Sequence, residues 1–193
     1  ISALTVQNEP DACQTWESCR YETVEEAEYA LVLADVLKEH DLDTKLLIWD
    51  HNKGNTYNRV NEIYPMVGDK VWGAAFHWYD GSHFDECQLI KDKYPDKVLI
   101  ETEFCSGFSS YYSDYRTEII GNLQHGVNGI IEWCLMADEN GSPFHNRDFG
   151  CVTTIYYDTR TKEIKKRGIY GKMYLFSNKI QKGAKVLYTS TFD

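Results

Sequence analysis

Five short apolar segments alternate with segments of helical length and periodicity, and this alternation restricts the fold more than any other feature of the sequence. The strand-like segments are residues 1–6, 45–49, 71–78, 98–104 and 127–135; the helix-like segments are 24–40, 56–66, 83–94, 111–125 and 168–180. Continuous apolar strands joined by helices are typical of a parallel sheet that is buried on both faces. The pattern therefore predicts an α/β fold, either an open doubly wound sheet or part of a (β/α)8 barrel.

Composition narrows the classes of partner. The 193 residues carry 20 basic and 30 acidic side chains, a formal net charge of −10. A nucleic acid or an anionic membrane surface needs a concentrated positive patch, so this balance argues against both. No apolar run approaches the length of a membrane span, and no strand is followed by a glycine-rich nucleotide motif. The cysteines and histidines lack the spacing of a zinc site, so we expect neither a metal nor a cofactor.

Polar, ionisable and aromatic residues gather where each predicted strand ends. These strand-end segments are Gln7–Pro10, Trp49–Asn52, His77–Asp80, Glu101–Glu103 and Glu132–Trp133. Parallel α/β sheets and barrels place their functional sites at the carboxyl ends of the strands. We therefore expect these side chains to meet at one rim of the sheet.

Two carboxylates at separate strand ends, Glu9 and Glu103, match the requirement for cleaving a glycosidic bond. One carboxyl group must protonate the leaving oxygen, and the other must attack the sugar or activate water. Glu101 lies two residues before Glu103, so strand periodicity predicts that it shares the same face as a deeper structural carboxylate. Glu132 is expected to join a side-chain network.

The motifs that contain these residues resemble glycoside hydrolase family 30, the family of the glucosylceramidases and related β-glucosidases, β-xylosidases and β-1,6-glucanases. The resemblance lies in Thr5-Val-Gln-Asn-Glu-Pro10, Phe76-His-Trp-Tyr79, Glu101-Thr-Glu-Phe-Cys105, Gly129-Ile-Ile-Glu-Trp133 and Asp138-Glu-Asn-Gly-Ser-Pro143. It implies a (β/α)8 TIM-barrel fold of which this chain supplies about five βα units, strands four to eight. Residues 1–193 would then form one partial catalytic domain.

The resemblance also implies roles for the two carboxylates and their neighbours. Glu9 would be the general acid/base and Glu103 the nucleophile of a retaining reaction that passes through a covalent glycosyl-enzyme. Asn8 would hydrogen-bond the sugar 2-hydroxyl, and Tyr79 would donate a hydrogen bond to Glu103. We expect a bell-shaped pH profile in which Glu103 sets the lower limb and Glu9 the upper limb.

Four further residues are expected at the sugar. The resemblance implies that His77 and Trp78 line the pocket and that Trp133 stacks on the apolar face of the ring. Asp50 would hold either a sugar hydroxyl or a neighbouring side chain. The implied partner is a β-linked sugar or glycolipid, and no cofactor or metal is implied.

Several alternatives stay open at this point. Strands one to three of the barrel have no counterpart in the sequence, so the barrel would be completed by a second copy or a partner fragment, or left open. The leading expectation is a retaining β-glycosidase that acts on β-glucosides or glucosylceramide-like lipids. The others are a catalytically impaired half-barrel that folds by self-association, a β-1,6-glucanase or β-xylosidase, and a carbohydrate-binding module. The chain opens at Ile1 in a strand-like segment and is compatible with a secreted or a cytoplasmic origin.

Overall fold

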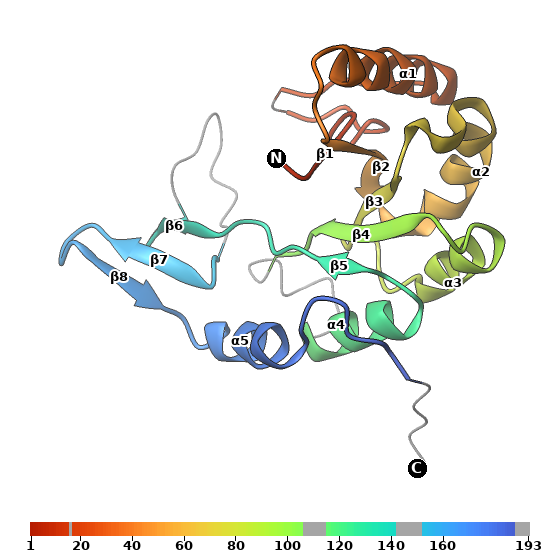
Figure 1. The fold of residues 1–193 in the computed structure, drawn as a ribbon. Coiled ribbons are helices and arrows are strands. Elements are labelled where there is room, and N and C mark those ends of the chain that lie inside the picture. Colours follow the sequence, from red (N-terminus) through yellow and green to blue (C-terminus); the bar gives the residue numbers. More distant parts are fainter. Residues whose placement is uncertain (16, 106–114, 142–151, 188–193) are drawn as a thin grey trace.

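The computed structural model describes residues 1–15, 17–105, 115–141 and 152–187, and its main feature is a five-stranded parallel sheet. The strands follow one another in sequence order: β1 (Ala3–Thr5), β2 (Lys45–Asn52), β3 (Gly73–His77), β4 (Val98–Glu103) and β5 (Gly129–Ile130). Every neighbouring pair is parallel (Figure 1). An order without reversal has no switch point, which a doubly wound sheet requires. The sheet is thus a half-barrel, as the resemblance implied.

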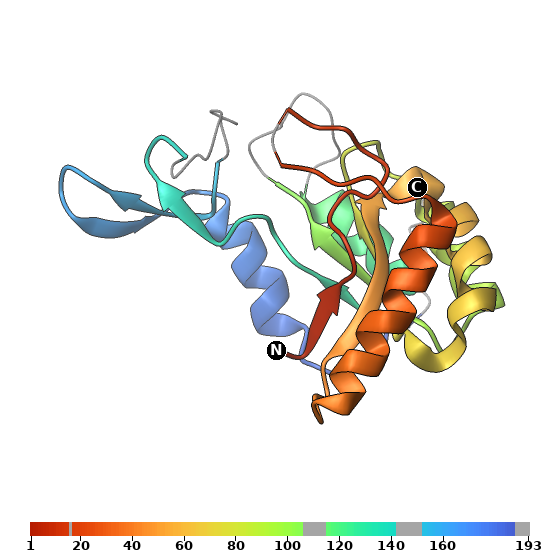
Figure 2. The same ribbon diagram turned by 90° about the horizontal axis from the view of Figure 1, so that it is seen from above.

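The helices lie along the outside of this sheet, as Figures 1 and 2 show. They are α1 (Thr23–Glu39), α2 (Thr56–Val67), α3 (Phe84–Lys93), α4 (Tyr115–Gln124) and α5 (Tyr170–Lys179), with short 3-10 turns at η1 (Lys53–Asn55) and η2 (Gly68–Lys70). Fully buried side chains from both layers form the main core, among them Ile48, Phe76 and Leu99 from strands and Val60 and Ile90 from helices. Burial of such side chains is the main stabilising contribution to this half-barrel. None of the helices in the described part is long and apolar enough to cross a bilayer.

The C-terminal third departs from the sequence-based prediction. The predicted strand 127–135 contains only Gly129–Ile130 as a strand of the barrel sheet. A separate three-stranded sheet follows, made of β6 (Met136–Asp138), β7 (Ile155–Asp158) and β8 (Glu163–Lys166), in a region predicted to be a loop. β7 and β8 form an antiparallel hairpin whose turn is held by Asp158, which accepts the backbone N–H groups of Arg160 and Thr161. Residues 111–114 of the predicted helix 111–125 lie outside the described residues.

A second apolar cluster joins the end of β4 to α4. It contains Trp78, Phe104, Tyr115 and Ile119, and it packs against residues at the start of α5. The Trp78 and Phe104 rings meet edge to face at 5.5 Å between centroids. This cluster holds α4 and α5 against the outer side of the barrel wall.

A buried ion cluster connects the helix layer to β4. The Lys53 ammonium of η1 pairs with Glu118 of α4, and both side chains are inaccessible to solvent. Glu101 lies 3.8 Å from the same ammonium and accepts a 2.9 Å hydrogen bond from Asn122. Its partners therefore come from η1 and α4, on the helix side of the sheet.

The prediction that Glu101 shares a face with Glu103 is consequently wrong. β3 and β4 change register between Phe76 and His77, where Phe76 pairs with Glu101 and His77 pairs with Glu103. A bulge of this kind inserts a residue and breaks the alternation of side chains along the strand. Glu101 thus points to the helices, while Glu103 belongs to the rim.

Burial affects the Glu101 carboxyl group of this cluster. Burial, together with the charge of Glu118, raises the pKa of Glu101 well above its usual range. The raised pKa favours the protonated form of Glu101, while Lys53 and Glu118 are in direct contact.

This assignment predicts different costs for two substitutions. Lys53→Met leaves the Glu118 carboxylate buried without its counter-ion, and we expect the free energy of unfolding to fall by about 3–5 kcal/mol. Glu101→Gln resembles the neutral acid in shape and charge, so its cost should stay within about 1 kcal/mol. Urea denaturation at pH 7 measures both values. An equal loss in the two variants would mean that Glu101 is ionised.

Candidate active site

The ends of four strands meet at the carboxylate of Asp50, which is 6% exposed. Asp50 lies on β2, and its Oδ2 accepts the Thr5 hydroxyl from β1. Its Oδ1 accepts the Thr102 hydroxyl from β4 and lies 3.1 Å from His77 Nε2 on β3. Asp50 thus holds neighbouring side chains, and a role toward a sugar hydroxyl stays a prediction.

A bulge in β2 places this carboxylate. The register of β2 against β3 shifts between Trp49 and His51, and the φ angles of Trp49 and Asp50 are 74° and 56°. Such positive φ values are strained for residues with side chains and are frequent at functional sites. The carbonyl of Asp50 accepts the backbone N–H of Glu9 at 2.9 Å, which ties the loop after β1 to the bulge.

His77 connects both carboxylates that the sequence singled out. Its imidazole is fully buried, and Nδ1 lies 3.3 Å from Glu9 Oε1 and 3.7 Å from Glu103 Oε2. Tyr79 donates its hydroxyl to Glu103 at 3.1 Å. Glu9 and Glu103, from strand ends 94 positions apart in the sequence, thus converge on one ring nitrogen.

The surrounding carboxylates keep His77 charged. Burial alone would lower the pKa of His77, but the hydrogen bonds to Asp50 and Glu9 and the charge of Glu103 raise it from 6.5 to about 10. The imidazolium offsets part of the repulsion between three neighbouring acids.

The two carboxyl groups respond to their surroundings in opposite directions. For Glu9, burial favours the neutral form, but the hydrogen bond and charge of His77 outweigh it and lower the pKa. For Glu103, burial dominates and raises the pKa, despite the opposing effects of His77 and Tyr79. The two directions are therefore the reverse of the expected pH limbs, because burial dominates at Glu103 while the contacts with His77 and Gln14 prevail at Glu9.

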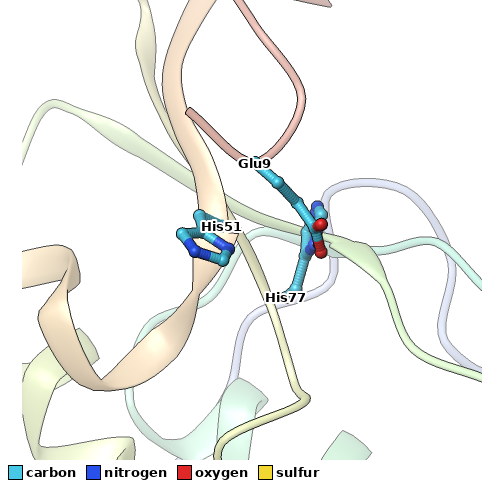
Figure 3. Close-up of side chains that lie close together, drawn as sticks. All are labelled: Glu9, His51 and His77. Carbon is cyan, nitrogen blue, oxygen red and sulfur yellow. The ribbon is translucent and has the colours of Figure 1, made fainter. Parts of the chain in front are cut away.

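Two residues near Glu9 were not assigned from the sequence. Gln14 donates its side-chain N–H to Glu9 Oε2 at 2.8 Å, which leaves both Glu9 oxygens with partners. His51 packs its ring on Trp49, with centroids 5.1 Å apart, and lies at the side of Glu9 and His77 (Figure 3). His51 was part of a strand-end segment, but Gln14 lies in a loop whose sequence gives no sign of this contact.

The remaining predicted residues are placed unevenly. Asn8 is exposed beside Glu9. Trp133 follows β5 and is half-buried, and its backbone N–H donates to the Phe104 carbonyl at 2.9 Å. Trp78 is 3% exposed and packs in the second apolar cluster. The structure therefore brings Glu9, Asp50, His77, Tyr79 and Glu103 together but leaves Trp78 in the core, because successive strand residues point to opposite faces.

The charge on His77 predicts how stability depends on pH. Because folding raises its pKa from 6.5 to about 10, the stabilisation is complete below pH 6.5 and is lost as pH rises toward 10. The free energy of unfolding of the native chain should fall across this window. The free energy of unfolding of His77→Gln should fall less. Urea titrations at several pH values measure the slopes, with the exposed His40→Gln as the matched control. Parallel slopes for the native chain and His77→Gln would contradict a charged His77.

Comparisons with known proteins identify the family of this fold. Residues 3–180 match the glycosyl hydrolase family 30 TIM-barrel domain. The chain is 26% identical over 209 residues to putative glucosylceramidase 3 of Caenorhabditis elegans, covering 96% of this chain and 40% of that protein. It is 24% identical to an endo-1,6-beta-D-glucanase of Neurospora crassa, covering 97% of this chain and again 40% of the relative.

Solved structures give the same result. The chain superposes on SrfJ from Salmonella typhimurium with a TM-score of 0.90 and 30% identity, covering all of this chain and 46% of SrfJ. On the endo-beta1,6-glucanase BT3312 the TM-score is 0.83, with 26% identity over 98% of this chain and 46% of that structure. The chain spans less than half the length of these relatives. It belongs to glycosyl hydrolase family 30, and it forms part of that family's TIM-barrel domain.

Proposed function

We propose that this chain carries the two catalytic carboxylates of a retaining β-glycosidase that acts on β-glucosides, glucosylceramide-like lipids included. The observation that carries the proposal is the convergence of Glu9 and Glu103 on His77 Nδ1. Retaining glycosidases hold their two carboxyl groups only about 5–5.5 Å apart. Two groups in contact with one nitrogen atom are compatible with that separation.

In the proposed reaction, Glu103 attacks the anomeric carbon while Glu9 protonates the departing glycosidic oxygen. A glycosyl ester forms on Glu103, and Glu9, now ionised, takes a proton from the water that hydrolyses this ester. A sugar seated on the rim excludes water from Glu9, which favours its protonated form. The ester removes the negative charge of Glu103, which in turn makes the ionised form of Glu9 easier to reach.

Other residues have supporting roles in this proposal. Tyr79 donates a hydrogen bond that stabilises the Glu103 carboxylate before attack. Asp50 orients His77, and His77 supplies positive charge between the two acids. Asn8 hydrogen-bonds the 2-hydroxyl, and Trp133 stacks on the sugar; both lie next to a catalytic strand end.

Completion of the barrel would involve the two edge strands of the sheet. Among the described strands, β1 and β5 each pair with a single neighbour, so both edges of the sheet are open. We propose that a partner fragment or a second copy of this chain completes the barrel there. The alternative is an open half-barrel with impaired catalysis.

The test of the retaining mechanism is covalent labelling with 2-deoxy-2-fluoro-β-glucosyl fluoride, followed by intact-mass measurement and peptide mapping. We expect one label, on Glu103, because the fluorine at C2 slows both steps, while the good fluoride leaving group keeps formation of the ester faster than its hydrolysis. Glu103→Gln should remain unlabelled, and Glu28→Gln, an exposed carboxylate on α1, should be labelled like the native chain.

Three outcomes of this labelling separate the alternatives. A label on Glu9 would mean that Glu9 is the nucleophile and Glu103 the acid/base. The lowered pKa of Glu9 and the raised pKa of Glu103 would agree with that exchange. Labelling that rises with protein concentration would support completion of the barrel by a second copy. A folded sample without label would support the impaired half-barrel or a binding module.

A second prediction concerns Glu9. Glu9→Gln should still accept the label, because fluoride leaves without a proton, but hydrolysis of an alkyl β-glucoside should fall about 10²–10⁴-fold. Initial rates with the glycosyl fluoride and with the alkyl β-glucoside measure this difference. An equal loss of rate with both substrates would mean that Glu9 does not act as the acid.

A β-1,6-glucanase is the second candidate, because the relatives include enzymes named endo-1,6-glucanases. Product analysis distinguishes the two. A β-glucosidase releases glucose from an aryl β-glucoside, whereas an endo-glucanase releases short oligosaccharides from a β-1,6-glucan. A β-xylosidase would prefer the aryl β-xyloside.

A further inference from the structure

We infer that Glu9, His51 and His77 form a binding site for a divalent transition-metal ion such as Zn²⁺ or Cu²⁺. Each residue offers one ligand atom, and the three atoms lie within 4.8 Å of one another. Glu9 follows β1, His51 lies on β2 and His77 lies on β3, so the donors come from three adjacent strands of the sheet. Figure 3 shows the carboxylate and the two rings gathered at this rim.

The donor set determines the class of metal. Two imidazole nitrogens and one carboxylate oxygen suit zinc and copper, whereas magnesium and calcium prefer oxygen ligands alone. Three protein ligands leave at least one coordination position for water or another ligand. The ligands are two histidines and one glutamate. Their spacing in the sequence does not match a zinc motif, so the sequence did not predict this site.

A second layer of contacts already orients one of the ligands. The Nε2 atom of His77 lies 3.1 Å from the Asp50 carboxylate, and two threonine hydroxyls hold that carboxylate in place. Nδ1 is thereby directed at Glu9. A carboxylate behind a ligating histidine is the usual support of a metal site, and it increases the basicity of the ring.

The surroundings of His51 support the metal site independently of the distances between the ligand atoms. Its Nδ1 is buried, and within the described part of the chain it has no hydrogen-bond partner. A buried polar atom without a partner costs free energy, so a native structure that keeps one calls for an explanation. A metal ion bound by His51 would provide a partner for this ring, directly or through a water molecule in its coordination sphere.

Binding requires a small movement and one proton transfer. Ligand atoms bound at about 2.1 Å lie at most about 4.2 Å apart, so the ion must draw the three side chains slightly together. The ion takes the place of the proton on His77 Nδ1, which is released to solvent. The bound Glu9 carboxylate can no longer carry a proton to a leaving group. If Glu9 is the acid proposed above, the ion is a reversible inhibitor.

The test is calorimetric titration of the metal-free chain with zinc chloride at pH 7.5. We expect one site in the native chain and in the exposed His40→Asn control. His51→Asn should weaken binding about tenfold or more, because it removes one of three ligands. With Cu²⁺, electron paramagnetic resonance should show coupling to two nitrogens in the native chain and to one in His51→Asn. His51→Gln serves as a second variant if His51→Asn does not fold.

Equal zinc affinity in His51→Asn and His40→Asn, or no binding at millimolar zinc, would overturn the inference. These readouts do not depend on activity. If the chain binds zinc but the fluorosugar does not label it, the metal site is supported and the proposed function is refuted. If both hold, zinc should block labelling of the native chain and lose this effect in His51→Asn.

Discussion

The hydrogen bonds to the Asp50 carboxylate are the interaction on which the rim depends. A single buried acid on β2 accepts groups from β1, β3 and β4, so the ends of four neighbouring strands are held at one point. A buried carboxylate is tolerated only when its oxygens have partners, and here three donors supply them. The bulge that turns Asp50 inward also presents the carbonyl that fixes Glu9.

The charge on His77 follows from this arrangement. Asp50 holds one ring nitrogen, and the other faces Glu9 and Glu103, so the imidazolium lies among three acids. Without that charge, two carboxylates this close would repel each other, and one would be forced to stay protonated. The same geometry supports both proposals for the rim, the pair of catalytic carboxylates and, with His51, the metal site.

The ion cluster of Lys53, Glu118 and Glu101 is the counterpart of this site on the helix side of β4. Glu101 and Glu103 are two residues apart, yet one packs against α4 and the other faces the rim. The end of β4 therefore carries a carboxyl group on each face of the sheet. The chain contains part of the family's TIM-barrel domain, and Glu9 and Glu103 both lie at its rim.

The sequence by itself determined the parallel sheet, its five strands and the helices between them, because periodicity and strand length depend on local residue types. It also determined the rim and its two carboxylates, since strand ends are visible in the sequence. The faces of Glu101 and Trp78, the β6–β8 sheet and the contact of Gln14 with Glu9 were decided by tertiary structure. Each depends on a register shift or on packing between distant segments. The opposite pKa directions of Glu9 and Glu103 were decided there too, because they depend on the burial of each carboxyl group and on its side-chain partners.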